Sequence, residues 1–206
     1  MTNRISEINL FFSTPVWTSI VPNFQNINDS ILEYIYELKS KDSEGLKRSN
    51  FKGWHSNNFD LNEPKPKEFV NSIQTPLKEL FNDMEWDLFK QKVKITSMWS
   101  IINNKDAFNE KHHHGNSALS AAYYVKAEKN AGDIVFFDPR QANVFHHPTS
   151  KEVNSVNAQV QSVTPKAGTL VLFPSYLEHK VNPNLSDDER IVISFNVALI
   201  RKKDLL

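Results

Sequence analysis

The spacing of apolar residues changes about halfway along the chain. In the first half, two segments carry apolar residues every three or four positions, as an amphipathic helix does. The first segment runs from Ile27 to Leu38, with Asn28 and Asp29 as candidate N-caps. The second follows Pro66 and places six apolar residues on one side: Phe69, Val70, Ile73, Leu77, Leu80 and Phe81. Pro76 lies inside this segment, so we expect a kink there or a division into two helices.

After Trp86 the period becomes two. The apolar residues Val93, Ile95, Trp99 and Ile101 alternate with polar ones, which predicts a β-strand. Further strands are expected at 118–125, 134–137, 159–163, 169–173 and 191–199. Short turns separate them without intervening helices, which is typical of an antiparallel double-sheet jelly roll or barrel.

The predicted fold is therefore mainly β, with a jelly-roll core buttressed on the outside of one sheet by two or three N-terminal α-helices. The chain shows no internal repeat, low-complexity tract or linker, and 206 residues fit one domain. We expect a single domain over residues 1–206, with a helical part at about 27–85 and a β core at about 91–200. The segment 45–66 has no period and is either a lid over a site or a packed surface loop.

The last predicted strand has two different faces. Its apolar face is suited to packing against the helices and contains Ile191, Ile193, Phe195, Val197 and Leu199. The opposite face carries Arg190 and Ser194. A guanidinium inside a barrel is costly unless it is paired, so an acidic ligand would satisfy Arg190. Arginine is also the side chain best matched to a carboxylate.

Composition excludes several classes of function. The 24 basic residues balance the 24 acidic ones, so no nucleic-acid or anionic-membrane partner is indicated. The absence of cysteine excludes disulfides, thiolate metal sites and cysteine nucleophiles. The N-terminus does not resemble a signal peptide, and no apolar stretch approaches the roughly 20 residues of a membrane span. We expect a soluble, most simply cytoplasmic protein; a homodimer is left open.

Histidines supply the candidate chemistry. Three are consecutive at 112–114, and a fourth, His179, follows a distant predicted strand. Because side chains alternate along an extended chain, His112 and His114 point one way and His113 the other. With His179 they form a three-point metal site that leaves room for a substrate or dioxygen, which predicts a non-haem iron centre. His146 and His147 are expected in a Pro-flanked loop, and His55 alone carries no signal.

The order of several segments in the second half resembles a known family. The segments are 112–114, 117–125, 137–140, 165–174, 179–181 and 190–196. Together they resemble 2-oxoglutarate- and Fe(II)-dependent oxygenases related to prolyl 4-hydroxylases, whose core is a double-stranded β-helix. The resemblance implies that His112 and His179 bind Fe(II), that 2-oxoglutarate chelates the metal, and that Arg190 binds its far carboxylate. It also implies hydroxylation of an unidentified small-molecule or peptidyl substrate, with release of succinate and CO2.

The first departure from the family pattern concerns the metal ligands. The usual first motif is His-any-Asp/Glu, and here the third position is His114. Either His114 replaces the carboxylate, or water or a distant acid, Asp138 or Glu110, fills that place. Halogenase-type enzymes also lack the carboxylate. If the chain followed their pattern, the motif would be His113-His114-Gly115 and His113 would be the first ligand. His112 and His114 lie two positions apart and so point to the same side of an extended chain, which favours the three-His site.

The second departure concerns the co-substrate. Related enzymes often carry a serine two residues after the arginine, and here that residue is Val192. Ser194, on the same strand face, and Tyr123 are the candidate substitutes in binding 2-oxoglutarate. Tyr124 is open as well, since whichever of the two tyrosines faces inward can donate a hydrogen bond to the ligand.

Two other functions compete with this prediction. One is a cupin-type three-His metal enzyme without a keto-acid co-substrate, and the other is a non-catalytic jelly-roll module with a structural zinc. Cupins usually place a glutamate a few residues after the His pair, yet the next acid after His114 is Glu128. A closed zinc site needs four ligands, and no convincing fourth is present.

Overall fold

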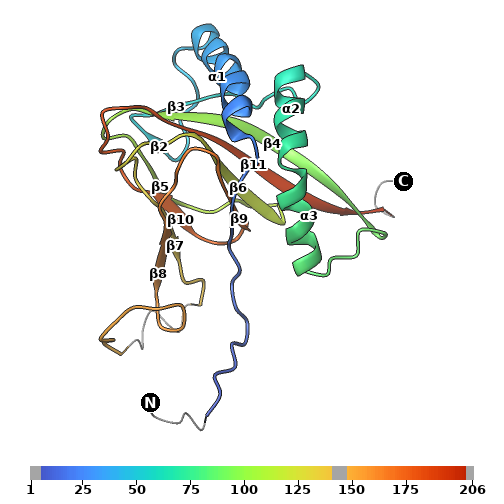
Figure 1. Cartoon of the computed structure of the whole chain (residues 1–206), viewed down its shortest axis with the longest axis vertical. Coiled ribbons are helices and arrows are strands. Elements are labelled where there is room, and N and C mark those ends of the chain that lie inside the picture. The colour runs from blue at the N-terminus through green and yellow to red at the C-terminus, as the bar shows by residue number, and fades with distance from the viewer. Residues whose placement is uncertain (1–5, 141–147, 203–206) are drawn as a thin grey trace.

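Two β-sheets face each other, and three helices cover the outer side of the larger one in the computed structural model, which describes residues 6–140 and 148–202 (Figure 1). The helices are α1 (Phe24–Lys41), α2 (Pro64–Ser72) and α3 (Gln74–Asp83). The first strands are β1 (Trp17–Ile20), β2 (Asn50–Phe51), β3 (Trp54–His55), β4 (Gln91–Asn103) and β5 (Phe108–His112). The others are β6 (Leu119–Lys126), β7 (Ile134–Phe137), β8 (Val160–Val163), β9 (Thr169–Pro174), β10 (His179–Val181) and β11 (Arg190–Arg201). His146 and His147 lie outside the described residues.

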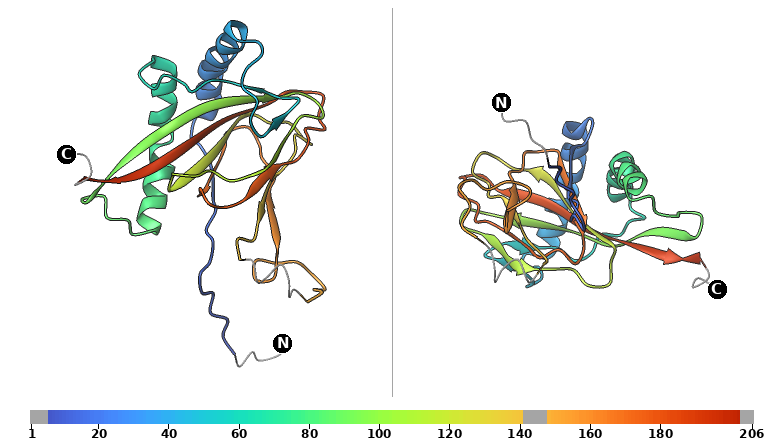
Figure 2. Two further views of the ribbon diagram at one scale, coloured as in Figure 1. Left: turned by 180° about the vertical axis from the view of Figure 1, so that it is seen from behind. Right: turned by 90° about the horizontal axis from the view of Figure 1, so that it is seen from below.

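The order of the strands is that of a double-sheet jelly roll. The larger sheet has the order β1-β9-β6-β11-β4-β3, and the smaller one β2-β5-β10-β7-β8. Neighbouring strands pair antiparallel in both sheets. This confirms the predicted mainly-β fold with buttressing helices. The two views in Figure 2 show the helices together on one side of the long β4 and β11 strands.

The main core lies between the helices and the larger sheet. Phe69 of α2 packs on Tyr123 of β6 and Phe195 of β11, with ring centroids 4.9 and 6.4 Å apart. The predicted apolar face of β11 is confirmed at four positions, which are buried in this core: Ile191, Ile193, Phe195 and Val197. Burying each such side chain contributes about 1.5–3 kcal/mol, so this contact fixes the helices on the sheet. The inner face of the sheet is left for a second, smaller cluster between the sheets.

One prediction about the helices is wrong, the N-cap of the first helix, and one is confirmed, the division of the second helical segment. The N-cap of α1 is Asn23, so the prediction of Asn28 or Asp29 is wrong. Asn28 is instead buried within α1, where its amide donates to the carbonyl of Val125 (2.7 Å). The expected division of the second helical segment is confirmed, because α2 and α3 meet at Ile73. Pro76 then lies in the first turn of α3, where its missing N–H removes no helical hydrogen bond.

A β-bulge in β4 changes which residues face inward. The pairing of β4 with β11 passes from Ile95 directly to Ser97, so Thr96 is extra. Simple alternation puts Val93, Ile95 and Trp99 on one face, but an extra residue reverses the parity. Val93 and Ile95 pack toward the helices, whereas Trp99 lines the cavity between the sheets.

The described helices are too short or too polar to cross a membrane.

Candidate active site

A cavity of about 590 Å³ opens between the two sheets. Its walls come from both sheets and from the segment before β3, whose residues Leu46, Arg48 and Ser49 line it. Of the two readings of segment 45–66, the structure therefore supports a cover over the site. Ligand pockets commonly enclose about 300–1,000 Å³, so the cavity has the size of a binding site for small molecules.

The structure brings the three predicted imidazoles together in this cavity. His112 ends β5 and His179 begins β10, and these residues are direct partners across the antiparallel pair. Their ring centroids lie 4.4 Å apart. The ring of His114 lies 5.2 Å from that of His112 and 5.3 Å from that of His179. One nitrogen from each ring falls within 4.8 Å of the others, a spacing that one metal ion can span.

Backbone carbonyls orient two of the three rings. Nδ1 of His112 donates to the carbonyl of Glu110 (2.7 Å), and Nδ1 of His179 donates to the carbonyl of Leu177 (2.9 Å). A carbonyl only accepts, so the proton is on Nδ1 and the lone pair is on Nε2 of both rings. Such hydrogen bonds to the remote nitrogen are typical of metal-ligating histidines. These rings fit a metal.

The rings are also held in the neutral form that binds metal. Burial, followed by the neighbouring imidazole of His112, lowers the pKa of His179 to about 3. The same two causes lower the pKa of His114 to about 4. Burial also lowers the pKa of His112. At neutral pH the site therefore presents three uncharged nitrogen donors.

The alternative ligands lie elsewhere. Asp138 forms two hydrogen bonds with the Arg140 guanidinium, at 3.0 and 2.7 Å. Glu110 is exposed, as is His113. Within residues 6–140 and 148–202, no carboxylate joins the cluster of imidazoles. The geometry therefore favours His114 over the acids and over the register that uses His113.

Arg190 is the second polar feature of the cavity. It begins β11 and is 1% exposed. Its Nη1 donates to the carbonyls of Ala131 and Asn182, but Nε and Nη2 have no hydrogen-bond partner within the described residues. The hydroxyl of Tyr124 is likewise buried and without a partner there. Burial lowers the pKa of Arg190 and raises that of Tyr124 to about 12. Two donor groups beside one cavity fit a carboxylate ligand.

Tyr123 is a wrong prediction for the co-substrate site. Its hydroxyl donates to Oδ1 of Asn28 (2.6 Å) on the face covered by the helices. Successive side chains in a strand point to opposite faces, so Tyr124 lines the cavity instead. Ser194 lines the cavity as predicted from its parity with Arg190.

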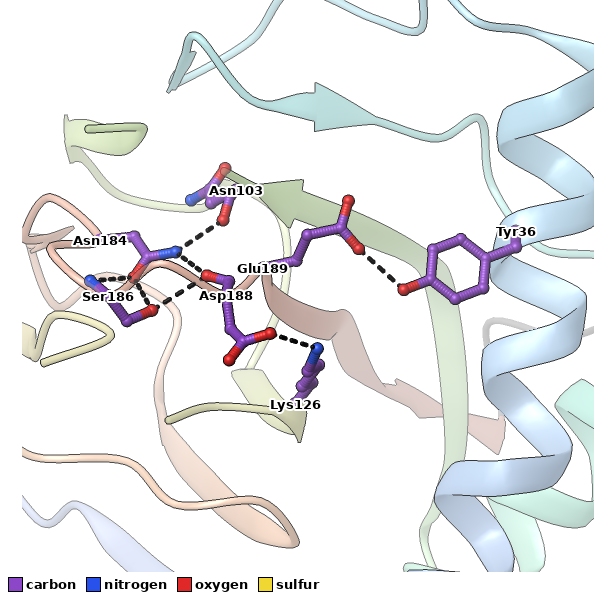
Figure 3. Close-up of polar contacts among 7 residues, drawn as sticks. All are labelled: Tyr36, Asn103, Lys126, Asn184, Ser186, Asp188 and Glu189. Atoms are coloured by element: carbon purple, nitrogen blue, oxygen red, sulfur yellow. Dashed lines mark hydrogen bonds and ion pairs between the residues drawn. The ribbon is translucent and has the colours of Figure 1, made fainter. Parts of the chain in front are cut away.

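A hydrogen-bonded loop fixes the start of β11 (Figure 3). The buried amide of Asn184 donates to the carbonyls of Asn103 (2.9 Å) and Asp188 (2.7 Å). The hydroxyl of Tyr36 in α1 donates to the carboxylate of Glu189 (2.7 Å), the residue before Arg190. These bonds tie the loop to β4 and to a helix, so the position of Arg190 is set by the scaffold rather than by its own ligand.

Gly132 allows the guanidinium to lie where it does. Its φ is +89°, and a Cβ there would fall 2.7 Å from Nη1 of Arg190 and 2.4 Å from the carbonyl oxygen of Asn182. Only glycine adopts this conformation without strain and leaves this space.

Two aromatic side chains of the cavity, His55 and Trp99, were not predicted to lie beside the metal ligands. His55 is buried and stacks on Trp99, with ring centroids 5.6 Å apart and planes 11° from parallel. Trp99 in turn lies 5.8 Å from the ring of His114. A single histidine in an aperiodic segment gives no sequence signal, and the bulge hides the orientation of Trp99.

A jelly roll with imidazoles and an incompletely hydrogen-bonded guanidinium around one inner cavity is the arrangement of a double-stranded β-helix metalloenzyme. The family described as "Putative 2OG-Fe(II) oxygenase" matches residues 97–196, the stretch that holds all these groups. This stretch is just under half of the chain and belongs to the 2-oxoglutarate- and Fe(II)-dependent oxygenases, which indicates that the protein is a 2-oxoglutarate-dependent dioxygenase. This confirms the predicted family and enzyme class, with iron and 2-oxoglutarate as cofactor and co-substrate, over the two competing functions.

Solved structures share the fold at low sequence identity. HygX from Streptomyces hygroscopicus, solved with nickel, 2-oxoglutarate and hygromycin B, is 13% identical with a TM-score of 0.61, over 90% of this chain and 83% of that one. A Pseudomonas putida prolyl-4-hydroxylase is 12% identical with a TM-score of 0.59, over 92% and 94% of the two chains. A Trichoplax adhaerens prolyl hydroxylase, in complex with a hypoxia inducible factor peptide fragment, is 12% identical with a TM-score of 0.61, over 92% and 84%. No curated protein sequence matches the chain.

Proposed function

We propose that His112, His114 and His179 bind Fe(II), and that Arg190 binds the far carboxylate of 2-oxoglutarate. Bound iron and 2-oxoglutarate supply the activation of dioxygen, with which the enzyme hydroxylates its substrate and releases succinate and CO2. The protein orients the metal and the co-substrate and excludes water from them. The metal ligands lie at one end of the cavity and Arg190 lies at the other.

The buried and incompletely paired guanidinium of Arg190 is the observation that carries the proposal. An unpaired charge inside a protein costs several kcal/mol, so the fold retains it where a ligand supplies the missing anion. Nε and Nη2 are the free donors on this group, and the Tyr124 hydroxyl lines the same cavity. Three donors of this kind match the two oxygens of a carboxylate.

At the metal end, His112 and His179 each present Nε2, since their Nδ1 protons are engaged by carbonyls. Phe173 packs against His179 with ring centroids 4.6 Å apart and excludes water from that side. Three neutral imidazoles leave both positive charges on Fe(II), whereas a two-His, one-carboxylate set leaves one. This additional charge favours binding of the dianionic co-substrate.

The test is an anaerobic titration with Fe(II) and 2-oxoglutarate, followed by the metal-to-ligand charge-transfer absorption of the chelate. We expect the band in the wild type and its loss in His179→Ala. Arg190→Gln should weaken 2-oxoglutarate binding by about 30-fold or more, since truncating one partner of a buried charge pair costs roughly 2–5 kcal/mol.

Arg201→Gln is the matched control, because Arg201 ends the same strand and is exposed. It should titrate as the wild type does. A wild-type protein without the band, or an Arg190→Gln variant with unchanged affinity, contradicts the proposal.

A further inference from the structure

The segment that precedes β3 forms one wall of the cavity, and this wall carries a second arginine, Arg48. Arg48 lines the cavity, and its backbone N–H donates to Oδ1 of Asn50 (2.8 Å). The amide of Asn50 donates in turn to the carbonyls of Leu46 (3.2 Å) and Gly53 (2.7 Å). A side chain therefore holds this turn in shape, and the backbone of Arg48 has a fixed place in it.

The turn lies directly beside the metal ligands. Ser49, the next residue, accepts a hydrogen bond from the N–H of Glu110 on its carbonyl (2.8 Å) and one from the amide of Asn109 on its hydroxyl (3.2 Å). Its Oγ is 3.5 Å from Nε2 of His112, the nitrogen assigned to the metal. Arg48 is thus one residue from the centre, on a different wall from Arg190. The side chain of Arg48 is exposed and lines the same cavity as His112, so an anion that enters this cavity can meet it.

The charges around the cavity are unbalanced. The described residues that line it include Arg48 and Arg190 but no aspartate or glutamate. Fe(II) and dianionic 2-oxoglutarate cancel each other, and the three imidazoles are neutral. Both guanidinium charges then remain, with one of them at the end where the co-substrate does not bind. Positive charge focused by low-dielectric walls attracts and holds anions.

Neutral hydrogen-bond donors accompany Arg48. Nε1 of Trp99 is buried without a partner within the described residues, and Trp99 lines the same cavity. The exposed side chains of Asn57 and Asn58 line it as well, from the far end of the same segment. This wall of the cavity thus carries several hydrogen-bond donors. Arg48 is the charged side chain on the wall, and its charge is positive.

We propose that the substrate of this oxygenase is a small molecule with a carboxylate or phosphate group, and that Arg48 binds this group. The inference rests on the proposed function, since it places the substrate beside a loaded centre. Arg48 is then a specificity-determining residue, separate from the residues that hold iron and 2-oxoglutarate.

The test uses protein loaded anaerobically with Fe(II) and 2-oxoglutarate. Phenylacetate and phenyl phosphate serve as anionic probes, and phenylacetamide as the neutral counterpart. Binding is measured by calorimetry and by the wavelength shift of the charge-transfer band. The band must persist throughout the titration, because a probe that displaces 2-oxoglutarate would abolish the band. The variants are Arg48→Gln and, as a matched control, Lys47→Gln, which removes an adjacent exposed charge that does not line the cavity.

We expect the wild type and Lys47→Gln to bind at least one anionic probe at least tenfold more tightly than phenylacetamide, and Arg48→Gln to lose this preference while keeping the band. Preference for phenylacetate assigns a carboxylate substrate, and preference for phenyl phosphate assigns a phosphate. Equal binding of phenylacetamide, no binding of either anion, or an unchanged preference in Arg48→Gln overturns the inference alone when the band is present. Absence of the band in the wild type overturns the proposed function itself, and the inference with it.

Discussion

Tyr123 and Tyr124 are neighbours in β6 that face opposite sides of the larger sheet, and removing their hydroxyls should have opposite effects. Tyr124→Phe removes a buried hydroxyl that has no partner within the described residues. Burying such a group costs about 1–3 kcal/mol, so the variant without ligand should be at least as stable as the wild type. Its affinity for 2-oxoglutarate should fall roughly 10- to 100-fold, because a hydrogen bond to a charged group contributes about 1.5–3 kcal/mol.

Tyr123→Phe is the control, since it removes the hydroxyl that donates to Oδ1 of Asn28 at 2.6 Å. The buried oxygen of Asn28 then loses this donor, at a cost of about 1–3 kcal/mol. For a chain of this length, each kcal/mol lowers Tm by about 2–4 °C. Affinity for 2-oxoglutarate should not change, because Tyr123 lies on the face covered by the helices.

The two measurements are thermal unfolding without ligand and anaerobic titration with 2-oxoglutarate. If Tyr124→Phe loses stability as Tyr123→Phe does and binds 2-oxoglutarate normally, its hydroxyl is structural. The pairing of Tyr124 with Arg190 at the co-substrate would then be refuted.

Three further predictions test the same scaffold. Gly132→Ala should weaken 2-oxoglutarate binding at least tenfold without loss of Fe(II) binding, because the new Cβ would lie 2.7 Å from Nη1 of Arg190; equal affinity in a titration would contradict this placement. His114→Asp should keep Fe(II) binding, since it restores the two-His, one-carboxylate set, whereas His114→Ala should lose at least tenfold in a competition assay with a chelator; equal affinity in both would exclude His114 as a ligand. The pKa of His179 falls from 6.5 unfolded to about 3 folded, so below pH 6.5 the unfolded chain binds the additional proton. Stability of the metal-free protein should be complete above pH 6.5 and be lost as pH falls toward 3, by up to about 1.4 kcal/mol per pH unit for this imidazole; denaturant unfolding at several pH values should show a flatter profile in His179→Gln.

Periodicity predicted those parts of the fold in which one face of an element is uniformly apolar. The faces of β11 follow from this signal, because burial against the helices leaves no other register. The division of the second helical segment follows instead from Pro76, which cannot continue a helix from the preceding turn. Metal spacing likewise brought His112, His114 and His179 together in the prediction. The shared side of His112 and His114 follows from alternation alone, whereas the convergence of His179, on a distant strand, is inferred from metal-ligand spacing and the family resemblance.

Other parts of the site depend on events that alternation cannot show. The extra Thr96 in β4 turns Trp99 toward the cavity, and nothing in the residues around it marks the bulge. The choice between Tyr123 and Tyr124 depends on which sheet face the helices cover. His55 reaches the cavity only because β3 pairs with the far end of β4, a contact between distant parts of the chain.

The direct partnership of His112 and His179 across β5 and β10 has a consequence for assembly. Interstrand hydrogen bonding sets the separation of these two rings before any ion arrives, unlike small zinc domains in which the ion itself drives folding. Since the strand pairing and not the ion holds the two rings together, exchange of one divalent ion for another should leave the architecture intact.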